Sequence, residues 1–441
     1  MKTTSKNNVF RNKNFTLLFF GVLVSNIAHV LFNFAISLYV LRVANQAYGA
    51  KQAAITQAVY LAIAGIVLLI FMPLGGVLAD KLNKVRIMYM TDFIRGFTIA
   101  ATALVIFFVD HTLTILIVLF LMNIILSINS AIFNPASSSL LRFIVDDESL
   151  QQASAYLQGS SNLQNIIGLI LGGIIYATLG IQWIFLINAF GYLFSAISEM
   201  FIRYDYLEHT EADVEISFKV MTADFKSGLS YLFSQKALFA TVMMALFLNF
   251  FFSPLFSNGL PYFIEFGLAN ESRYLFDHFL TPETWYAVIS VSISISSILM
   301  ALILSRQKTK TKYHKQLKLA IVLSIACTTM TSVFMVLYYL QKITIDVTLI
   351  GLVISLFFTG FTLMSFNVPI TLIFQRNVEP KQLGKVSSVM SVLTQALVPL
   401  GSLVAGVIIA QLGPMYLFIF SVVGALIVGI HYVTNKKVNE L

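Results

Sequence analysis

Acidic and basic side chains lie inside or beside long apolar runs of this sequence, where they could hold or pass on a proton. Asp92 and Arg95 are three residues apart, and Glu199 comes four residues before Arg203. Residues three or four apart share a helical face, so each carboxylate can pair with its guanidinium. Ionisable groups within a membrane are costly and often mark ion or substrate pathways. We expect an ion pair for Glu199, while Asp92 is either half of a structural ion pair or a residue for proton transfer or gating.

His29 and Glu265 are two further positions where a proton could be carried. The imidazole of histidine titrates near neutral pH, and His29 shares a helical face with Asn26 and Asn33. A histidine that only hydrogen bonds between helices is the alternative. Glu265 lies at the end of an apolar run in an acid-rich region, where it would either collect protons or cations or simply be solvated. His29, Asp92 and Glu265 are therefore the predicted proton-coupling residues.

Polar and aromatic side chains on the faces of several apolar runs form a third group. Each could line a cavity or hydrogen bond to a neighbouring helix, and the second role is better supported for any single residue. As a group they predict a central cavity, and phenylalanine-rich segments would give it aromatic walls suited to a large amphipathic ligand. The predicted cavity residues are Asn26, Asn33, Asn123, Ser130, Asn162, Asn165, Asn249 and Phe252.

Long apolar runs must position all of these side chains. The 441-residue chain is 58% hydrophobic and only 11% charged, with a mean hydropathy of +0.84, whereas soluble domains carry about 25% charged residues. The runs are continuously apolar and long enough to cross a bilayer as helices, and they lack the alternation of barrel strands. The sequence therefore predicts an all-α membrane protein. The twelve predicted spans are 15–42, 52–79, 86–109, 112–141, 151–179, 181–202, 237–266, 284–305, 316–341, 346–375, 384–412 and 414–434.

Basic residues orient these spans. If the N-terminus lies in the cytoplasm, the twelve spans place 24 of the 28 Lys and Arg residues on the cytoplasmic side. The four on the outer side are Arg42, Lys51, Arg273 and Lys342. Cytoplasmic loops carry the excess of positive charge. We therefore expect a multi-pass protein of the cell membrane with both termini in the cytoplasm. The net charge of +8 is explained by topology, and nucleic acid is not an expected partner.

An internal repeat divides the predicted spans into two halves. Shifting the chain by 233 residues aligns FNPASSSLLRFIVDDESL at 133–150 with FNVPITLIFQRNVEPKQL at 366–383, and glycine pairs such as Gly168 and Gly401 follow in the same register. Two similar halves in one orientation predict a substrate site between them near the middle of the membrane. The expected parts are a cytoplasmic N-terminus at 1–14, six-helix bundles at 15–202 and 237–434, a linker at 203–236 and a cytoplasmic C-terminus at 435–441. An amphipathic helix is expected in the linker, either on the inner membrane surface or packed without lipid contact.

The segment GVLADKLNKVR at 76–86 resembles the loop between the second and third helices of the major facilitator superfamily. The resemblance implies twelve helices in two pseudo-symmetric halves and a gate at the inner mouth. It also implies that the motif glycine, Gly76, lets the second helix approach a neighbouring helix closely. In the family this charge cluster contacts the start of the eleventh helix, which is expected near Pro380 here. The resemblance implies that the residues of this motif form the gate together with Asp92 and Arg95. The motif residues are Gly76, Asp80, Lys81, Lys84 and Arg86.

The continuation of this segment resembles the drug:proton antiporter branch that includes macrolide and siderophore exporters. It carries Asp92-x-x-Arg95, and the stretches 11–28, 133–136 and 180–198 are similar as well. Three departures weaken proton-coupled antiport. The arginine that many drug antiporters place inside the fourth helix has no match, since Arg142 lies at the cytoplasmic end of that helix. Ala28-His29 stands where these exporters often have Gly-Asp, and the run GLILGG at 168–173 lacks the proline of the antiporter motif.

The resemblance implies secondary active transport, in which an ion gradient drives export of amphipathic, drug-like small molecules by alternating access. No nucleotide-binding loop, metal-ligand spacing or nucleophile constellation is present in the sequence, so neither an enzyme nor a cofactor is expected. The expected partners are membrane lipid, a small-molecule substrate and the proton, with the chain acting as a monomer. The alternatives are an exporter of one endogenous metabolite, such as a siderophore-like chelator or a lipid, and a lipid scramblase or transport-inactive sensor.

Overall fold

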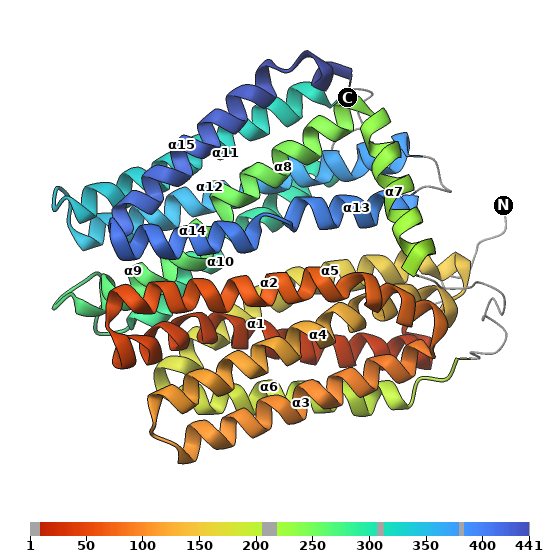
Figure 1. Ribbon diagram of the computed structural model, residues 1–441, viewed down its shortest axis with the longest axis horizontal. Coiled ribbons are helices and arrows are strands. Elements are labelled where there is room, and N and C mark those ends of the chain that lie inside the picture. Colours follow the sequence, from red (N-terminus) through yellow and green to blue (C-terminus); the bar gives the residue numbers. More distant parts are fainter. Residues whose placement is uncertain (1–8, 205–217, 307–312, 379–382, 441) are drawn as a thin grey trace. The chain divides into compact units, whose positions relative to one another are not determined.

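A computed structural model describes residues 9–204, 218–306, 313–378 and 383–440, and in these ranges the regular elements are helices (Figure 1). Six helices make up the first part of the chain: α1 Lys13–Tyr48, α2 Ala50–Lys81, α3 Lys84–Phe108, α4 Thr112–Ile144, α5 Asp147–Thr178 and α6 Ile181–Met200. The others are α7 Phe218–Ser234, α8 Lys236–Pro254, α9 Leu260–Phe266, α10 Pro282–Ser305, α11 His314–Tyr339, α12 Ile345–Asn377, α13 Leu383–Gln395, α14 Val398–Gln411 and α15 Pro414–Thr434.

The predicted spans agree with these helices. Eleven helical segments of the described residues are long and apolar enough to cross a membrane. The predicted fifth span, α5, is not among them, because Ser, Asn and Gln side chains interrupt its apolar run. Two spans are also broken: a π-helical turn at Leu255–Gly259 separates α8 from α9, and α14 restarts after α13 with a proline in its first turn. Proline has no N–H to give to the preceding turn, so a helix begins there readily.

The chain forms two compact units and passes from one to the other within α1, within α2 and just before α7. The first unit comprises residues 1–36 and 63–216. Its helix α3 packs against α4 and α6. A buried apolar cluster that includes Phe15, Leu18, Met88 and Leu140 joins α1, α3 and α4. This unit holds most of the ionisable side chains that the sequence places inside apolar runs.

The second unit comprises residues 37–62 and 217–441. It therefore contains the outer hairpin, by which we mean residues 37–62, the end of α1 and the beginning of α2. The buried Gln57 side chain ties this hairpin to the unit, because its amide donates hydrogen bonds to the carbonyl oxygens of Ser37 at 3.0 Å and Ser257 at 3.4 Å. Helix α12 packs against α10 and α11, and α15 packs against α8 and α11.

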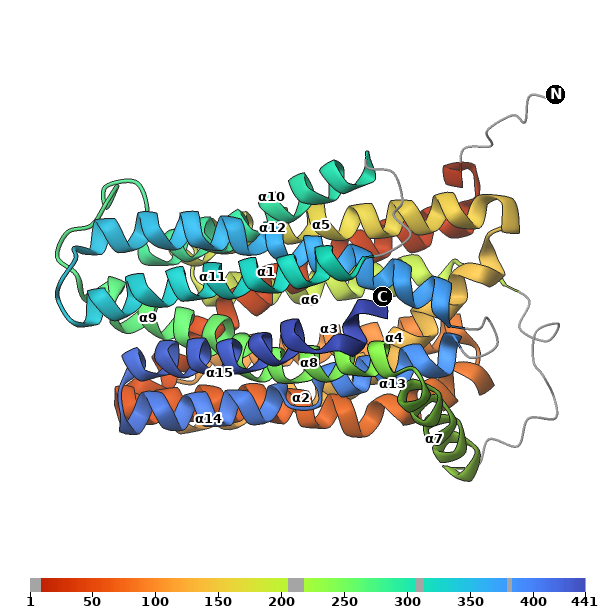
Figure 2. The ribbon, with the colours of Figure 1, turned by 90° about the horizontal axis from the view of Figure 1, so that it is seen from above.

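Helix α7 is the helix expected in the linker. It leaves the direction of its neighbours and packs against α13 and α8 (Figure 2). Leu232 is fully buried there, and Gly228 lies so close to α13 that an added Cβ would be 2.8 Å from the Lys385 carbonyl oxygen. One face of α7 is thus packed on the second unit, and contact of its exposed face with the membrane surface stays a prediction. Residues 205–217 of the linker lie outside the described ranges.

The internal repeat reappears as equivalent glycine geometry in each unit. Gly180 and Gly413 each precede the last helix of their half and have φ of 86° and 106°, a left-handed conformation that suits glycine. An added Cβ at Gly168 would lie 2.9 Å from a carbonyl oxygen of α1, and one at Gly401 would lie 2.6 Å from a carbonyl oxygen of α8. Each half thus packs its fifth span closely against its first, as the repeat predicts.

Candidate functional site

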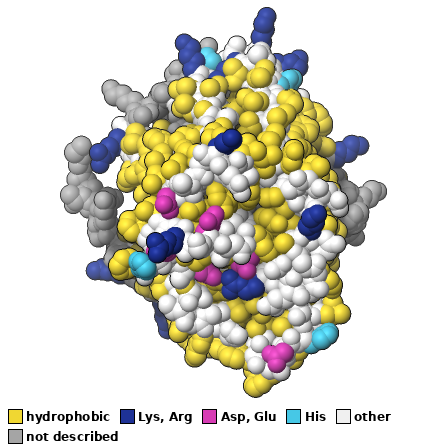
Figure 3. Space-filling model, turned by 90° about the vertical axis from the view of Figure 1, so that its left-hand side faces the viewer, with side chains coloured by type: hydrophobic (Ala, Val, Ile, Leu, Met, Phe, Trp, Pro, Cys, Tyr) yellow, Lys and Arg dark blue, Asp and Glu magenta, His cyan; other side chains and the backbone are white. Residues whose placement is uncertain are grey.

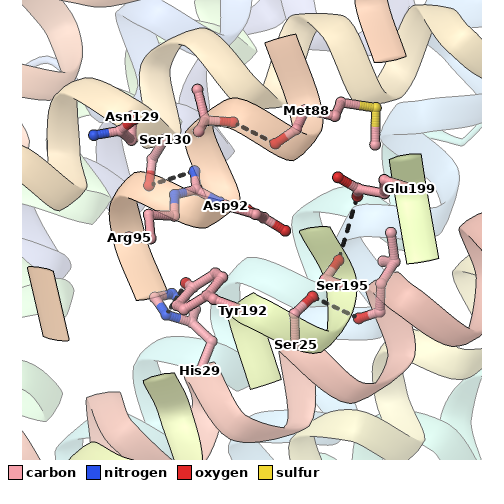
Figure 4. A network of polar contacts seen from close by, with 12 residues as sticks. Ser25, His29, Met88, Asp92, Arg95, Asn129, Ser130, Tyr192, Ser195 and Glu199 are labelled. Atoms are coloured by element: carbon pink, nitrogen blue, oxygen red, sulfur yellow. Dashed lines mark hydrogen bonds and ion pairs between the residues drawn. The ribbon is translucent and has the colours of Figure 1, made fainter. Parts of the chain in front are cut away.

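A buried polar cluster lies in the first unit, where α1, α3, α4 and α6 meet (Figure 4). We define the polar cluster as His29, Asp92, Arg95, Ser130, Tyr192, Ser195 and Glu199. The side chains of Asp92 and Glu199 are 0% exposed and Arg95 is 4% exposed. Two carboxylates and one guanidinium are therefore buried together, an arrangement that is costly unless the charges compensate one another.

Arg95 is held from several sides. Its guanidinium donates to the Asp92 carboxylate at 3.0 Å, as the spacing of the two residues predicts, and to the Ser130 hydroxyl of α4 at 3.2 Å. It also lies over the rings of Phe133 and Tyr192, with 4.7 and 5.3 Å to the ring centroids. Aromatic faces attract cations, most strongly where water is excluded. The guanidinium is thus fixed by groups of α3, α4 and α6.

Glu199 faces this cluster and not Arg203, so the predicted ion pair between Glu199 and Arg203 is wrong. The Ser195 hydroxyl donates to Glu199 at 3.3 Å and also lies close to the Asp92 carboxylate. The two carboxylates are near enough to repel each other. One oxygen of each, Oδ2 of Asp92 and Oε2 of Glu199, is buried without a hydrogen-bond partner. A single bound proton would bring the summed charge of Asp92, Glu199 and Arg95 to zero.

His29 joins the polar cluster through Tyr192. The Tyr192 hydroxyl lies 2.9 Å from Nδ1 of His29, and the Asn33 amide nitrogen lies 2.9 Å from Nε2. An amide nitrogen only donates, so Nε2 of the His29 ring accepts from Asn33. The neutral ring then carries its proton on Nδ1 and can donate it to the Tyr192 hydroxyl. A doubly protonated ring would require the Asn33 amide to turn its oxygen toward Nε2. Both roles left open for His29, a helix-to-helix hydrogen bond and a proton carrier, thus remain compatible with its contacts.

Close helix packing positions the polar cluster. Gly96 of α3 is so near α6 that an added Cβ would lie 2.8 Å from the Leu193 side chain. Gly191 of α6 approaches α1 in the same way, with 2.7 Å to the Cβ of Ala28. Small residues allow helix backbones to approach in membranes. The polar faces of α1, α3 and α6 are thereby brought within hydrogen-bonding distance.

The predicted cavity residues fall in both units. Asn26 donates to the Gln164 side chain at 3.1 Å, and Asn249 donates to the Thr394 carbonyl oxygen at 3.0 Å. Both contacts are hydrogen bonds between helices. The remaining members differ in exposure: Asn123 is buried, Ser130, Asn162 and Phe252 are half-buried, and Asn33 and Asn165 are exposed. Of the predicted cavity residues only Ser130 belongs to the polar cluster, and the central cavity stays a prediction.

Glu265 has an ionic partner that the sequence analysis did not assign to it. The carboxylate of Glu265 receives two hydrogen bonds from Arg42, at 2.9 and 3.0 Å, and Arg42 also donates to Glu283 at 3.0 Å. All three residues belong to the second unit. The end of the molecule viewed in Figure 3 shows acidic side chains next to basic ones. Glu265, whose side chain is 11% exposed, is thus an ion-paired group rather than a freely solvated one.

Replacing Arg42 by alanine should loosen the outer hairpin. The change leaves the carboxylates of Glu265 and Glu283 next to each other without a cation, at a partly exposed site where an ion pair contributes about 1 kcal/mol. We expect about fivefold faster hydrogen exchange of the backbone amides in residues 37–62, measured by mass spectrometry. Lys51→Ala, which removes an exposed cation of the same hairpin, is the control. Equal exchange in the two variants would show that Arg42 does not hold the hairpin.

The loop motif at 76–86 is described in part. Asn83 caps α3, because its side-chain oxygen accepts from the Arg86 N–H at 3.1 Å. The Lys84 side chain is buried and lies over the Phe143 ring at 4.9 Å, whereas Lys81 and Arg86 are exposed. The side chain of Asp80 and the residues around Pro380 lie outside the described part of the chain. The predicted contact between them therefore stays a prediction.

The close approach expected of the motif glycine occurs one residue earlier. An added Cβ at Gly75 would lie 1.9 Å from the carbonyl oxygen of Ala131 on α4. At Gly76, no described atom lies within 4 Å of an added Cβ. Gly75 is thus the residue that lets α2 pack directly on α4 within the first unit, and the expectation for Gly76 was wrong.

Comparison with known proteins identifies the family. The sequence model of the Major Facilitator Superfamily matches residues 18–395. The chain belongs to this superfamily. Macrolide efflux protein A of Streptococcus pyogenes is 22% identical over 382 residues, which make up 84% of each chain. The uncharacterized MFS-type transporter YkuC of Bacillus subtilis is 25% identical over 273 residues, or 60% of this chain and 59% of that one.

Solved structures share the fold of this Major Facilitator Superfamily chain. A D-xylose-proton symporter aligns with a TM-score of 0.72 at 11% identity, covering 97% of this chain and 98% of the other. A bacterial homologue of the iron transporter ferroportin, in an inward-facing state, aligns with a TM-score of 0.68 at 14% identity, covering 97% and 100%. The predicted all-α fold of two six-helix halves is confirmed, as is the resemblance to the efflux branch. The chain is a multi-pass membrane transporter and not an enzyme.

Three members of the polar cluster were not among the site residues predicted from the sequence of this transporter. Tyr192, Ser195 and Glu199 follow one another on α6 at spacings of three and four, which is one helical face. The spacing was therefore readable. Glu199 was instead paired with Arg203, the nearest cation in sequence. In the structure its carboxylate is buried and accepts from Ser195, near Asp92.

Proposed function

We propose that this transporter exports amphipathic, macrolide-like small molecules across the cell membrane in exchange for protons, by alternating access. The observation that carries the proposal is the buried set of two carboxylates with one guanidinium, Asp92, Glu199 and Arg95. Its charge is −1 when both carboxylates are ionised and zero when one proton is bound. A buried group that can change charge by one proton is what coupling to a proton gradient requires.

The substrate class in this proposal rests on the relatives. Macrolide efflux protein A, by its name, exports macrolides, and it matches this chain over 84% of its own length. The orientation in this proposal rests on the basic loops, which favour cytoplasmic termini. In the proposed cycle, protons enter from outside, neutralise the polar cluster and leave to the cytoplasm as substrate moves outward. Asp92 and Arg95 serve as coupling residues, with His29 and Tyr192 as their hydrogen-bonded neighbours.

Transport in proteoliposomes tests this function. We expect an imposed pH gradient to drive movement of radiolabelled erythromycin, a macrolide, by the wild-type protein. In Asp92→Asn the set keeps one carboxylate and one guanidinium and is neutral without a bound proton. The gradient should then no longer accelerate transport. Asp110→Asn, the same change at an exposed position between α3 and α4, should retain the acceleration.

Three other outcomes would overturn the proposal. Full coupling in Asp92→Asn would show that the carboxylate set does not carry the proton. Lipid movement that is independent of any gradient would indicate a scramblase. Wild-type protein that moves neither erythromycin nor other amphipathic cations would indicate a single-substrate exporter or a sensor.

A further inference from the structure

An apolar groove lies in the second unit between α8 and α15. Its volume is about 830 Å³, within the range of about 300–1,000 Å³ that is usual for ligand sites. Its walls come from α8 and α15, together with Phe233 of α7 and with Asn435 and Lys437, which follow α15. They comprise mainly the aromatic and methionine side chains Phe233, Phe239, Met243, Met244, Phe247 and Phe251.

The walls of the groove offer almost no polar partner along their length. Tyr432 is the one tyrosine that lines it, and its hydroxyl is already paired with the Thr241 hydroxyl at 3.2 Å on the buried side. The rings of Phe233 and Phe239 pack against each other with centroids 4.6 Å apart. A ligand that fills this part of the groove must therefore be a hydrocarbon chain or an equally apolar body.

One end of the groove is basic. Lys236, at the first position of α8, and Lys437, just beyond α15, both line it and are both exposed. His431 lies at the same end, and none of the lining residues is acidic. The first turn of α8 adds to this positive potential, because a helix dipole is positive at its N-terminus. The groove thus combines an apolar slot with a cationic rim.

We propose that this groove binds an anionic phospholipid, with an acyl chain in the slot and the phosphate between Lys236 and Lys437. The charge of the rim selects the occupant. A cationic amphiphile such as a macrolide would be repelled by the two ammonium groups, and a zwitterionic lipid would bring a second cation to them. An anionic lipid of the leaflet in which α8 begins has the matching charge and already lies in the membrane beside the groove.

Lipid titration of the purified full-length protein in detergent, followed by native mass spectrometry, tests this site. Phosphatidylglycerol should bind more tightly than phosphatidylcholine with the same acyl chains. Removal of both cations in Lys236→Gln/Lys437→Gln should weaken phosphatidylglycerol about 30-fold, since each lysine near an anionic lipid contributes about a factor of five. The affinity for phosphatidylcholine should not change.

A matched control separates the groove from general charge. Lys13→Gln/Lys315→Gln removes two other exposed lysines and should leave the lipid preference as it is in the wild type. Ala240→Trp, which fills the slot, should reduce binding of phosphatidylglycerol while the rim stays intact. Equal affinity of wild type for the two lipids would overturn the proposal, as would an unchanged preference in the folded Lys236/Lys437 variant. If Ala240→Trp does not fold, the lysine variants alone decide.

Discussion

Arg95→Met is expected to lower the free energy of unfolding of this transporter by about 3–5 kcal/mol. The change removes the only cation of the polar cluster and leaves the carboxylates of Asp92 and Glu199 buried side by side, and breaking a buried ion pair from one side carries a cost of this size. The Ser130 hydroxyl and the rings of Phe133 and Tyr192 lose their cationic partner as well. Reversible denaturation in mixed detergent micelles, followed by tryptophan fluorescence, would measure the loss.

Stepwise neutralisation tests whether charge is the cause. Arg95→Met/Asp92→Asn retains one unpaired carboxylate and should recover part of the stability. Adding Glu199→Gln leaves no charge in the cluster and should recover most of it, because replacing a buried ion pair by neutral groups is often close to neutral in free energy. If both combinations stay as unstable as the single variant, lost packing around the guanidinium, and not uncompensated charge, explains the effect.

The helices of this protein were predictable because each membrane span is a long apolar run. Polar residues between the runs mark where each helix begins and ends. The predicted span 346–375 and the helix α12, Ile345–Asn377, differ by two residues at most. The bilayer demands that backbone polar groups pair within each segment, so an apolar run of this length has one solution. The π-helical turn after Pro254 was not predictable in this way, because composition does not distinguish it from an α-helical turn.

The polar cluster was predictable only where its members are near in sequence. The Asp92–Arg95 pair follows from its spacing, and His29 from being an ionisable group in an apolar run. Arg42 and Glu265 are 223 residues apart, so their contact depends on how the outer hairpin packs. Glu199 was misassigned because a cation four residues away was a plausible partner, while the structure buries the carboxylate against α1 and α3. Long-range packing, which one sequence does not record, decides these cases.

Gly75→Leu should be among the most damaging single changes in the first unit, whereas Gly76→Leu should be tolerated. A Cβ at position 75 would meet the backbone of α4, with 1.9 Å to the Ala131 carbonyl oxygen and 2.7 Å to its carbon. A backbone atom cannot turn away as a flexible side chain can, so α2 and α4 must separate. Overpacking costs about 1–3 kcal/mol even where side chains adjust, and we expect about 3 kcal/mol here.

The position of Gly75 also ties the motif loop to the polar cluster. Ala131 follows Ser130, whose hydroxyl accepts a hydrogen bond from Arg95. It also lies two residues before Phe133, whose ring packs against the Arg95 guanidinium. Pushing α4 away from α2 therefore withdraws two groups that fix the guanidinium. In Gly75→Ala, the mildest change, we expect folded protein with impaired pH-driven transport, while Gly76→Ala in the same proteoliposome assay matches the wild type. Equal transport by the two alanine variants would mean that α4 can shift without disturbing Arg95, and the motif loop would then act only through the residues at its charged end.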